Sequence, residues 1–159
     1  MKKQLSIVEE IPTSNDVVNE SLFEIYKYSN KMEKICIENN ILGLAASQVG
    51  IPLNFFVFKN QNIFECYLNC SYEGIGEEYK SIESCLNFKN KNKLRRFEMQ
   101  RHFEIKVSGK KMLVYPSISL ENFSETKKGV EAVVFAQLID LQNGKFISKL
   151  GKELEIYVE

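Results

Sequence analysis

Sequence typical of strands fills the middle of this 159-residue chain, and helical patterns lie on both sides of it. Aromatic and β-branched residues are concentrated at residues 53–59 and 63–70, which we predict to be strands. Residues 102–116 are predicted to form two more strands around a turn at residues 108–110, and residues 117–123 alternate apolar and polar side chains as a further strand. Helices before and after such a block predict an α+β fold, in which antiparallel β-sheets pack around a C-terminal helix.

The N-terminal helical pattern covers residues 17–40. Its apolar side chains recur at helical spacing, so they form a stripe that needs a packing partner. Ser14 or Asn15 is positioned to cap the start of this helix, and Asn39 and Asn40 are suited to end it. We therefore predict an N-terminal helix with one buried face.

A second helical pattern begins at Gly129, where apolar side chains fall along one side of the helix until an Asn-Gly pair at residues 143–144 can end it. Beyond this helix, residues 145–150 are predicted to be a short strand and residues 153–159 a C-terminal strand. No repeat, flexible linker or long block of charge divides the sequence, so residues 1-159 are expected to form a single domain.

Composition excludes several classes of partner and location. The 21 basic and 21 acidic residues cancel, so no overall charge attracts the chain to nucleic acid or anionic lipid. There is neither a run of about 18 apolar residues nor a secretory signal at the start, so we expect no membrane contact and a cytoplasmic location. Four cysteines are too few to indicate a disulfide framework, and the single histidine, His102, excludes chemistry that needs two imidazoles.

A short segment bounded by glycines, GLAASQVG at residues 43–50, precedes a predicted strand. It resembles the first motif of peptide deformylases, the enzymes that remove the formyl group from the N-terminal Met of nascent chains. The resemblance implies that this loop lies beside the active metal and that its backbone groups bind the substrate peptide. It also implies that Gln48 corresponds to the side chain that stabilises the oxyanion, and that most of the chain has the deformylase fold.

The segment SIESCLNFK, residues 81–89, is similar to the second deformylase motif, Glu-Gly-Cys-Leu-Ser. Cys85 stands where the family has the thiolate ligand of its metal ion, whereas Ser84 and Asn87 replace the Gly and Ser of the motif. The residues of the first two motifs that the resemblance assigns to peptide binding are Gly43, Leu44, Gln48, Glu83 and Leu86.

The third deformylase motif, His-Glu-x-x-His on a helix, aligns with QLIDLQNG at residues 137–144. Gln137 and Leu141 then stand at the two His positions and Leu138 at the catalytic Glu, while the Asp, Asn and Gly that accompany the motif are retained. Deformylases hold Fe, Ni or Zn with one thiolate and two imidazoles, and the Glu accepts a proton from the attacking water. Leucine has no lone pair and an amide is a poor ligand for such metals, so we expect no metal, no cofactor and no intact catalytic residue.

The cavity of a lost metal site must be either refilled or wet. Leu138 and Leu141 extend the apolar stripe of the helix, so an apolar plug beneath the first-motif loop is expected. Gln137 lies on the same stripe and needs hydrogen-bond partners, for which Gln48, the Cys85 thiol or backbone groups are candidates. We therefore predict that Gln137 contacts the surroundings of Cys85.

These features favour a peptide deformylase-like protein that is inactive as a deformylase and keeps a groove for peptide N-termini or a protein partner. The alternative is an active deformylase, or another amide hydrolase, that uses non-standard ligands or Cys85 as a nucleophile with Gln48 as oxyanion donor. His102, as the only imidazole, is the candidate base for that chemistry, but a lone His in a predicted strand is more typical of a surface or strand residue. The basic stretch Lys89 to Arg96 is interpreted as a solvated loop, with contact to ribosomal RNA as the alternative.

Overall fold

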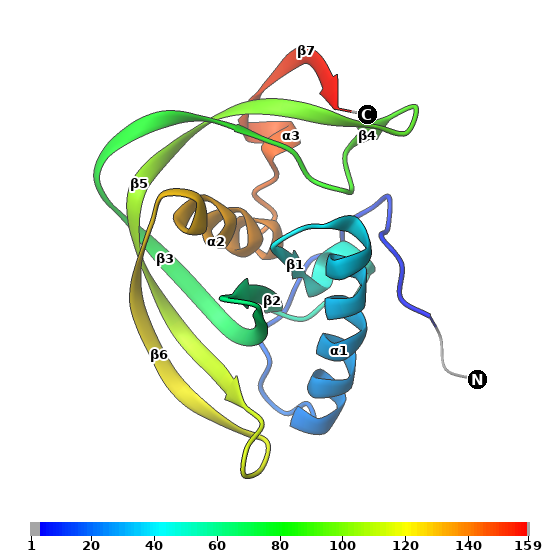
Figure 1. Cartoon of the computed structure of the whole chain (residues 1–159), viewed down its shortest axis with the longest axis vertical. Helices are drawn as coiled ribbons and strands as arrows, with labels where there is room; N and C mark the ends of the chain where they lie inside the picture. Colours follow the sequence, from blue (N-terminus) through cyan, green and yellow to red (C-terminus); the bar gives the residue numbers. More distant parts are fainter. Residues whose placement is uncertain (1–3, 159) are drawn as a thin grey trace.

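The structure, a computed structural model, describes residues 4–158 (Figure 1). Within that range the elements in chain order are α1 (Leu22–Asn39), β1 (Gly43–Ala45), the 3-10 turn η1 (Ala46–Val49), β2 (Phe55–Asn60), β3 (Ile63–Glu83), β4 (Lys89–Asn90), β5 (Lys93–Leu113), β6 (Ser119–Lys128), α2 (Gly129–Gln142), α3 (Ile147–Leu150) and β7 (Lys152–Val158). No helix in the described part of the chain is long and apolar enough to cross a membrane.

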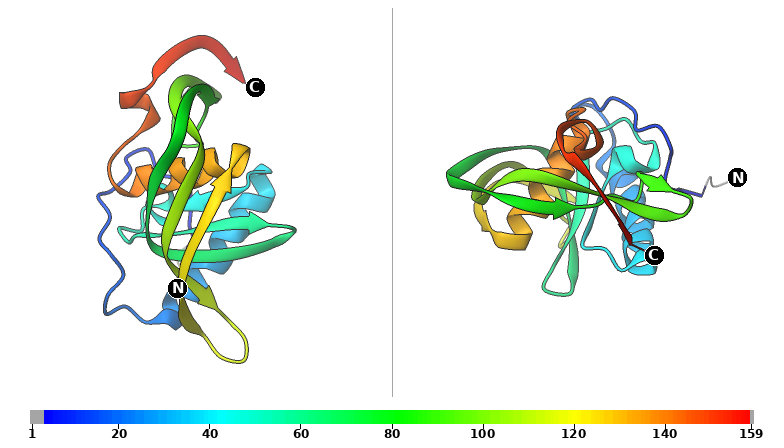
Figure 2. Two further views of the ribbon diagram at one scale, coloured as in Figure 1. Left: turned by 90° about the vertical axis from the view of Figure 1, so that its left-hand side faces the viewer. Right: turned by 90° about the horizontal axis from the view of Figure 1, so that it is seen from above.

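The described strands form one antiparallel sheet, whose path is β1-β2-β3-β5-β4, with β6 and β7 also paired to β5. Strands β3 and β5 have 21 residues each and pair along most of that length, from Tyr67 opposite Lys111 to Glu83 opposite Phe97. Figure 1 shows these two strands arching round α2 with β6 alongside β5, and Figure 2 shows the same arch from two further directions. The predicted sheet around a C-terminal helix is therefore confirmed.

Strand β2 shows how the sheet separates two hydrophobic clusters. Phe56 and Phe58 pack on the side of α2, where both rings contact Phe135 of that helix. Phe55 and Val57 belong to the other cluster, which α1 covers with its buried side chains. Because neighbouring residues point to opposite faces of a strand, one apolar run contributes to both clusters. The two long helices are thus fixed on different faces of the sheet.

Helix α1 begins later than the sequence pattern predicts. Its N-cap is Ser21, whose hydroxyl accepts a hydrogen bond from a backbone amide of the first turn. Neither Ser14 nor Asn15 caps it, because Asn15 forms an isolated bridge with Leu53 that holds this segment extended. The predicted end is correct, since Asn40 closes the helix in the left-handed conformation.

The predicted turn at residues 108–110 is wrong, because β5 continues through it. Gly109 pairs with Phe123 of β6 and lies against β3. A Cβ at Gly109 would come within 2.6 Å of the Cys70 sulfur and 2.9 Å of the Cys70 Cα. Glycine is needed here because two strands approach closely, and not because the chain reverses.

The segment after α2 also differs from its prediction. Residues 147–150 form one helical turn, α3, where the sequence pattern indicates a short strand. The turn buries Ile147 and ends at Gly151, where a Cβ would come within 2.7 Å of the Met99 sulfur. So short a pattern does not separate a strand from a helical turn by its periodicity. Helix α2 ends with Asn143 as its C-cap and β7 forms the C-terminal strand, both as predicted.

Candidate functional site

A pocket of about 240 Å³ lies between β1, the segment that follows β3, and α2. It brings together the three segments that resemble deformylase motifs, although they are far apart in the sequence. Their lining residues are Gly43, Gln48, Ser84, Cys85, Leu86, Gln137 and Leu138. Apolar side chains of Ile41, Leu42, Leu94 and Val134 complete the wall.

The side chain of Gln48 is bonded at both of its polar atoms. Its Oε1 accepts the Ala45 amide at 2.9 Å, and its Nε2 donates to Cys85 Sγ at 3.2 Å and to Asn87 Oδ1 at 2.9 Å. The Cys85 thiol donates to the same Asn87 oxygen at 3.4 Å, so three side chains form a closed triangle. An amide nitrogen carries two hydrogens, and the triangle uses both. Gln48 therefore has no free N–H to offer a carbonyl oxygen in the pocket.

Asn87, which stands at the Ser position of the second motif, organises this triangle. Its Nδ2 donates to the carbonyls of Val8 and Gln48, at 2.8 and 3.0 Å. The side chain thus ties the N-terminal segment to the first-motif loop and fixes the orientation of Gln48. The sequence pattern assigns Asn87 no role, because the partners of its longer side chain depend on the fold.

Cys85 is buried, with 5% of its surface exposed. Burial raises the pKa of its thiol to about 11, and hydrogen bonds from the Asn87 backbone and the Gln48 side chain oppose this rise only in part. The thiol is therefore protonated at neutral pH. A protonated thiol is a poor nucleophile and a poor metal ligand, because both roles need the thiolate.

Gln137 lies at the wall of the pocket near Cys85. Its Nε2 donates to Glu83 Oε1 and to the Ser84 carbonyl, both at 3.2 Å. The predicted contact with the surroundings of Cys85 is confirmed, but the side-chain partner is Glu83 and not Gln48 or the thiol. The amide of Gln137 is thereby anchored to the segment that precedes Cys85.

Glu83 belongs to a buried ionic network that the sequence patterns do not predict. Arg101 of β5 donates to both Glu83 oxygens, at 2.8 and 2.9 Å, and to Asp140 Oδ2 at 2.7 Å. Tyr72 donates its hydroxyl to the other Asp140 oxygen at 2.8 Å. Burial alone would lower the pKa of Arg101, but its bonds to the two carboxylates outweigh burial and raise this pKa, so the guanidinium stays charged. The network joins the second motif segment to the third.

Leu138 and Leu141 fill the space where the deformylase motif would present a Glu and a His. Leu138 is 2% exposed and Leu141 is 1% exposed. Leu138 reaches the first-motif loop, since a Cβ at Gly43 would come within 2.7 Å of its Cδ1. The predicted apolar plug beneath this loop is therefore present.

Gly43→Ala is expected to lower the free energy of unfolding by about 1–3 kcal/mol, because overpacking has this typical cost. The new methyl group would meet Leu138 Cδ1 at 2.7 Å and the Val57 carbonyl at 2.9 Å. Urea denaturation measures the loss. In a Leu138→Ala background the added cost of Gly43→Ala should be smaller, because one of the two clashing groups is gone. The same cost in both backgrounds would contradict close packing of Leu138 against the loop.

The donor atoms at this site do not fit the metal ion that the motif resemblance implies. Cys85 is the retained ligand position, but the imidazole positions hold an alkyl group and an amide, and the amide already bonds Glu83 and Ser84. Among the residues that the structure describes, no group of three or more His, Cys, Asp or Glu side chains could hold a metal ion. A borderline ion needs three or four N or S donors in one place. The residues present do not supply them.

Two of the five residues assigned to peptide binding do not line the pocket. Leu44 is fully buried in the cluster that α1 covers, and Glu83 is held in the ionic network. His102 lies on β5, where its Nδ1 is 3.0 Å from a backbone carbonyl and its Nε2 is 3.4 Å from Glu78. Since His102 is not a lining residue, the imidazole does not adjoin Cys85 in the pocket.

The basic stretch at residues 89–96 forms β4, a turn and the start of β5. Lys89, Lys91 and Lys93 are exposed, whereas Leu94 contributes to the wall of the pocket. These lysines therefore stand in solvent next to the site, on the hairpin drawn beside the label of β4 in Figure 1.

An antiparallel sheet arched round a central helix, with three motif segments meeting in one pocket, defines the peptide deformylase class of protein. The family model for polypeptide deformylase matches residues 10–155, and the chain therefore belongs to that family. No curated protein matches this chain in sequence.

Solved deformylase structures share this fold. The Thermotoga maritima enzyme is 24% identical, with a TM-score of 0.76 over 94% of this chain and 98% of that one. The Synechococcus elongatus enzyme, in complex with actinonin, is 18% identical, with a TM-score of 0.78 over 96% of this chain and 81% of that one. The Met-Ala-Ser-bound Acinetobacter baumannii enzyme is 18% identical, with a TM-score of 0.72 over 91% and 96%. At these identities the structural similarity establishes the fold, whereas the chemistry has to be argued from the residues of the site.

Proposed function

We propose that this chain does not hydrolyse formyl-peptides and instead binds peptide N-termini in its pocket. The observation that carries the proposal is the closed triangle of Gln48, Cys85 and Asn87, which lies in the same pocket as Leu138. The triangle occupies the amide that would serve an oxyanion, and the burial of Cys85 keeps its thiol protonated. The protein would then be a deformylase relative without deformylase chemistry.

Hydrolysis of a formamide needs an activated water and a group that accepts its proton. Leu138 and Leu141 can neither bind a metal ion nor accept a proton, and they are packed into the core. A thiolate route through Cys85 is disfavoured as well, because the thiol is buried and His102 lies outside the pocket. Both the metal-dependent and the thiol-dependent routes therefore lack a reactive group.

The pocket is suited to an apolar side chain such as that of Met. Its wall is built largely from the side chains of Ile41, Leu42, Leu86, Leu94 and Val134. Burying a Met side chain contributes about 1.5–3 kcal/mol, and the flexible thioether adapts to irregular walls. This gain does not require any catalytic group.

Strand β1 offers backbone groups to an extended peptide. It lies at one end of the path of the sheet and pairs with β2. The Lys59 amide donates to the Leu42 carbonyl at 2.7 Å, so Leu42 is a hydrogen-bonded position of the ladder. Because hydrogen-bonded and non-hydrogen-bonded positions alternate along an antiparallel strand, the N–H and C=O of the next residue, Gly43, point away from β2 to the open side. Peptides add to such edges as a further strand. A peptide whose first side chain fills the pocket would then run along Gly43.

Two further observations support this proposal. The Acinetobacter enzyme of the same fold was solved with Met-Ala-Ser bound, so a Met-first peptide is the natural probe for this chain. All four cysteines are free and buried, which suits the reducing cytoplasm, where newly made peptide N-termini are available.

The test is incubation of the full chain with formyl-Met-Ala-Ser in the presence of Fe²⁺, Ni²⁺ or Zn²⁺, with bound peptide and released formate both measured. We expect saturable binding without formate above the level of the buffer. Formate release in proportion to protein concentration would contradict the loss of catalysis. Failure to bind both the formylated and the free peptide would contradict the peptide site.

Val134→Phe is expected to weaken peptide binding at least about tenfold, because the larger side chain fills a pocket whose apolar burial supplies the affinity. Val130→Phe is the matched control, since Val130 lies one turn earlier on α2, is 69% exposed and does not line the pocket. It should bind the peptide as the parent chain does. Equal weakening by the two substitutions would contradict binding in this pocket.

A further inference from the structure

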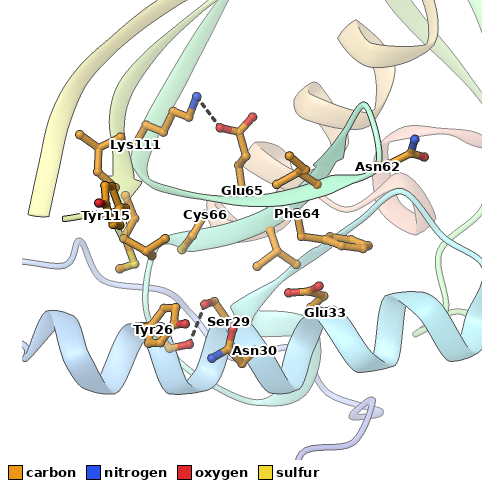
Figure 3. Close-up of a pocket in the computed structure, with 15 residues that line it drawn as sticks. Tyr26, Ser29, Asn30, Glu33, Asn62, Phe64, Glu65, Cys66, Lys111 and Tyr115 are labelled. Carbon is orange, nitrogen blue, oxygen red and sulfur yellow. Dashed lines mark hydrogen bonds and ion pairs between the residues drawn. The ribbon is translucent and has the colours of Figure 1, made fainter. Parts of the chain in front are cut away.

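A second cavity, of about 600 Å³, lies between α1, the turn from β2 to β3, and the end of β5 (Figure 3). We call it the α1 groove. Its lining residues are Tyr26, Ser29, Asn30 and Glu33 from α1, Val57 from β2, residues 62–66 and residues 111–115. None of them lines the pocket between β1 and α2, so the two sites can be tested separately. The volume falls in the range typical of small-molecule sites.

The floor of the α1 groove is apolar and its rim is partly aromatic. Val57, Cys66 and Met112 are buried there as part of the cluster that α1 covers. Figure 3 shows Tyr115 at one end and Phe64 toward the other. Tyr115 is 88% exposed, so a large ring at the rim is available to a ligand. These surfaces favour a ligand with an apolar body.

Among the residues that the structure describes, the α1 groove has one charged side chain without a partner, Glu33. Lys111 and Glu65 form an ion pair, and Glu65 also accepts a hydrogen bond from Asn60, so this pair is neutral as a whole. Glu33 is half-buried and has no hydrogen bond or ion pair with any residue that the structure describes. Figure 3 shows it across the groove from Phe64. The groove therefore keeps a net negative charge beside an apolar surface.

We propose that the α1 groove binds a small organic amine, whose ammonium group pairs with Glu33 and whose apolar body covers the floor. A carboxylate and an ammonium form short, charge-assisted hydrogen bonds. The ring face of Phe64, which lies across the groove from Glu33, attracts a cation as well, and the side-chain oxygens of Asn30 and Asn62 are further acceptors. A neutral or anionic ligand of the same shape lacks the positive charge that the Glu33 carboxylate and the aromatic ring attract. The amine site does not depend on peptide binding in the other pocket.

The test is an NMR titration of the isotope-labelled full chain with phenethylamine, with phenethyl alcohol as the neutral counterpart and phenylpropionate as the anionic one. We expect saturable shifts of the backbone amides that line the α1 groove, with the alcohol and the acid binding at least about tenfold more weakly. Absence of saturable shifts in the groove with the amine would overturn the site. Equal affinity for amine and alcohol would overturn the role of charge.

Glu33→Gln removes the charge at almost constant shape and is expected to weaken amine binding about tenfold. Glu38→Gln is the matched control, because it makes the same change at an exposed position of α1 outside the groove. It should bind phenethylamine as the parent chain does, and the amide spectra of both variants report whether the fold is intact. Unchanged binding in Glu33→Gln, or an equal loss in both variants, would overturn the proposal.

Discussion

Changing Gln137, Leu138 and Leu141 together to His, Glu and His is expected to create a metal site that holds about one Zn²⁺ or Ni²⁺ per chain. Two imidazoles one helical turn apart reach the same ion, and Cys85 lines the same pocket as Gln137, so three donors would leave one position for water. The new Glu would accept a proton from that water, a role that typically contributes about 10²- to 10⁴-fold in rate. The variant should therefore release formate from formyl-Met-Ala-Ser, and metal analysis with a formate assay measures both changes.

Two further substitutions in this triple variant separate metal binding from stabilisation of the oxyanion. Cys85→Ser should weaken metal binding, because the donor set loses its thiolate. Asn87→Ser should raise the rate of formate release, because it frees an N–H of Gln48 to stabilise an oxyanion. Such a donor is typically worth about 10²- to 10³-fold. A folded triple variant that binds no metal would contradict the view that these three positions account for the missing site.

Arg101→Met is expected to destabilise the protein by about 3–5 kcal/mol, the usual result of removing one partner from a buried ionic network. Glu83 and Asp140 would remain with side chains only 3% and 6% exposed and without their cation. Methionine is a flexible apolar side chain that can occupy part of the space of the arginine stem, so the loss would report mainly the uncompensated charge. Urea denaturation of variant and parent measures the difference.

Arg95→Met is the matched control for this prediction. Arg95 also bonds both oxygens of a glutamate, Glu153, at 3.1 and 2.7 Å. Their side chains are 31% and 37% exposed, so water screens the pair and we expect a loss below about 1 kcal/mol. Similar losses for Arg95→Met and Arg101→Met would show that the buried network does not hold the second and third motif segments together.

Local sequence rules located most helices and strands, and they failed where residues distant in the sequence determine the local conformation. Asn15 carries the signal of a helix cap, but Leu53 takes its backbone into a bridge. Gly109 carries the signal of a turn, but its lack of a side chain serves the close approach of Cys70. In both cases the partner that determines the structure is distant in the sequence, since Leu53 lies just before β2 and Cys70 lies in β3. Propensity within a short window contains no information about such a partner.

The candidate site, like the fold, was predictable from the sequence only in part. Motif spacing placed Gln48, Cys85 and Gln137 around one pocket, because the motifs record a three-dimensional arrangement. The sequence contained a signal for the ionic network too, since a carboxylate such as Asp140 in an apolar helix needs a buried cation. Selecting Arg101 from 21 basic residues requires the register of β5, which only the fold provides.

Bound metal in the unaltered chain is the most direct measure of whether the deformylase centre has been lost. The protein would be incubated with Fe²⁺, Ni²⁺ or Zn²⁺ without oxygen, desalted, and analysed for metal and protein. Because Cys85 is accompanied by an anchored amide and an aliphatic side chain, we predict far less than one ion per chain for each metal. About one tightly held ion per chain, lost on Cys85→Ser, would contradict the account.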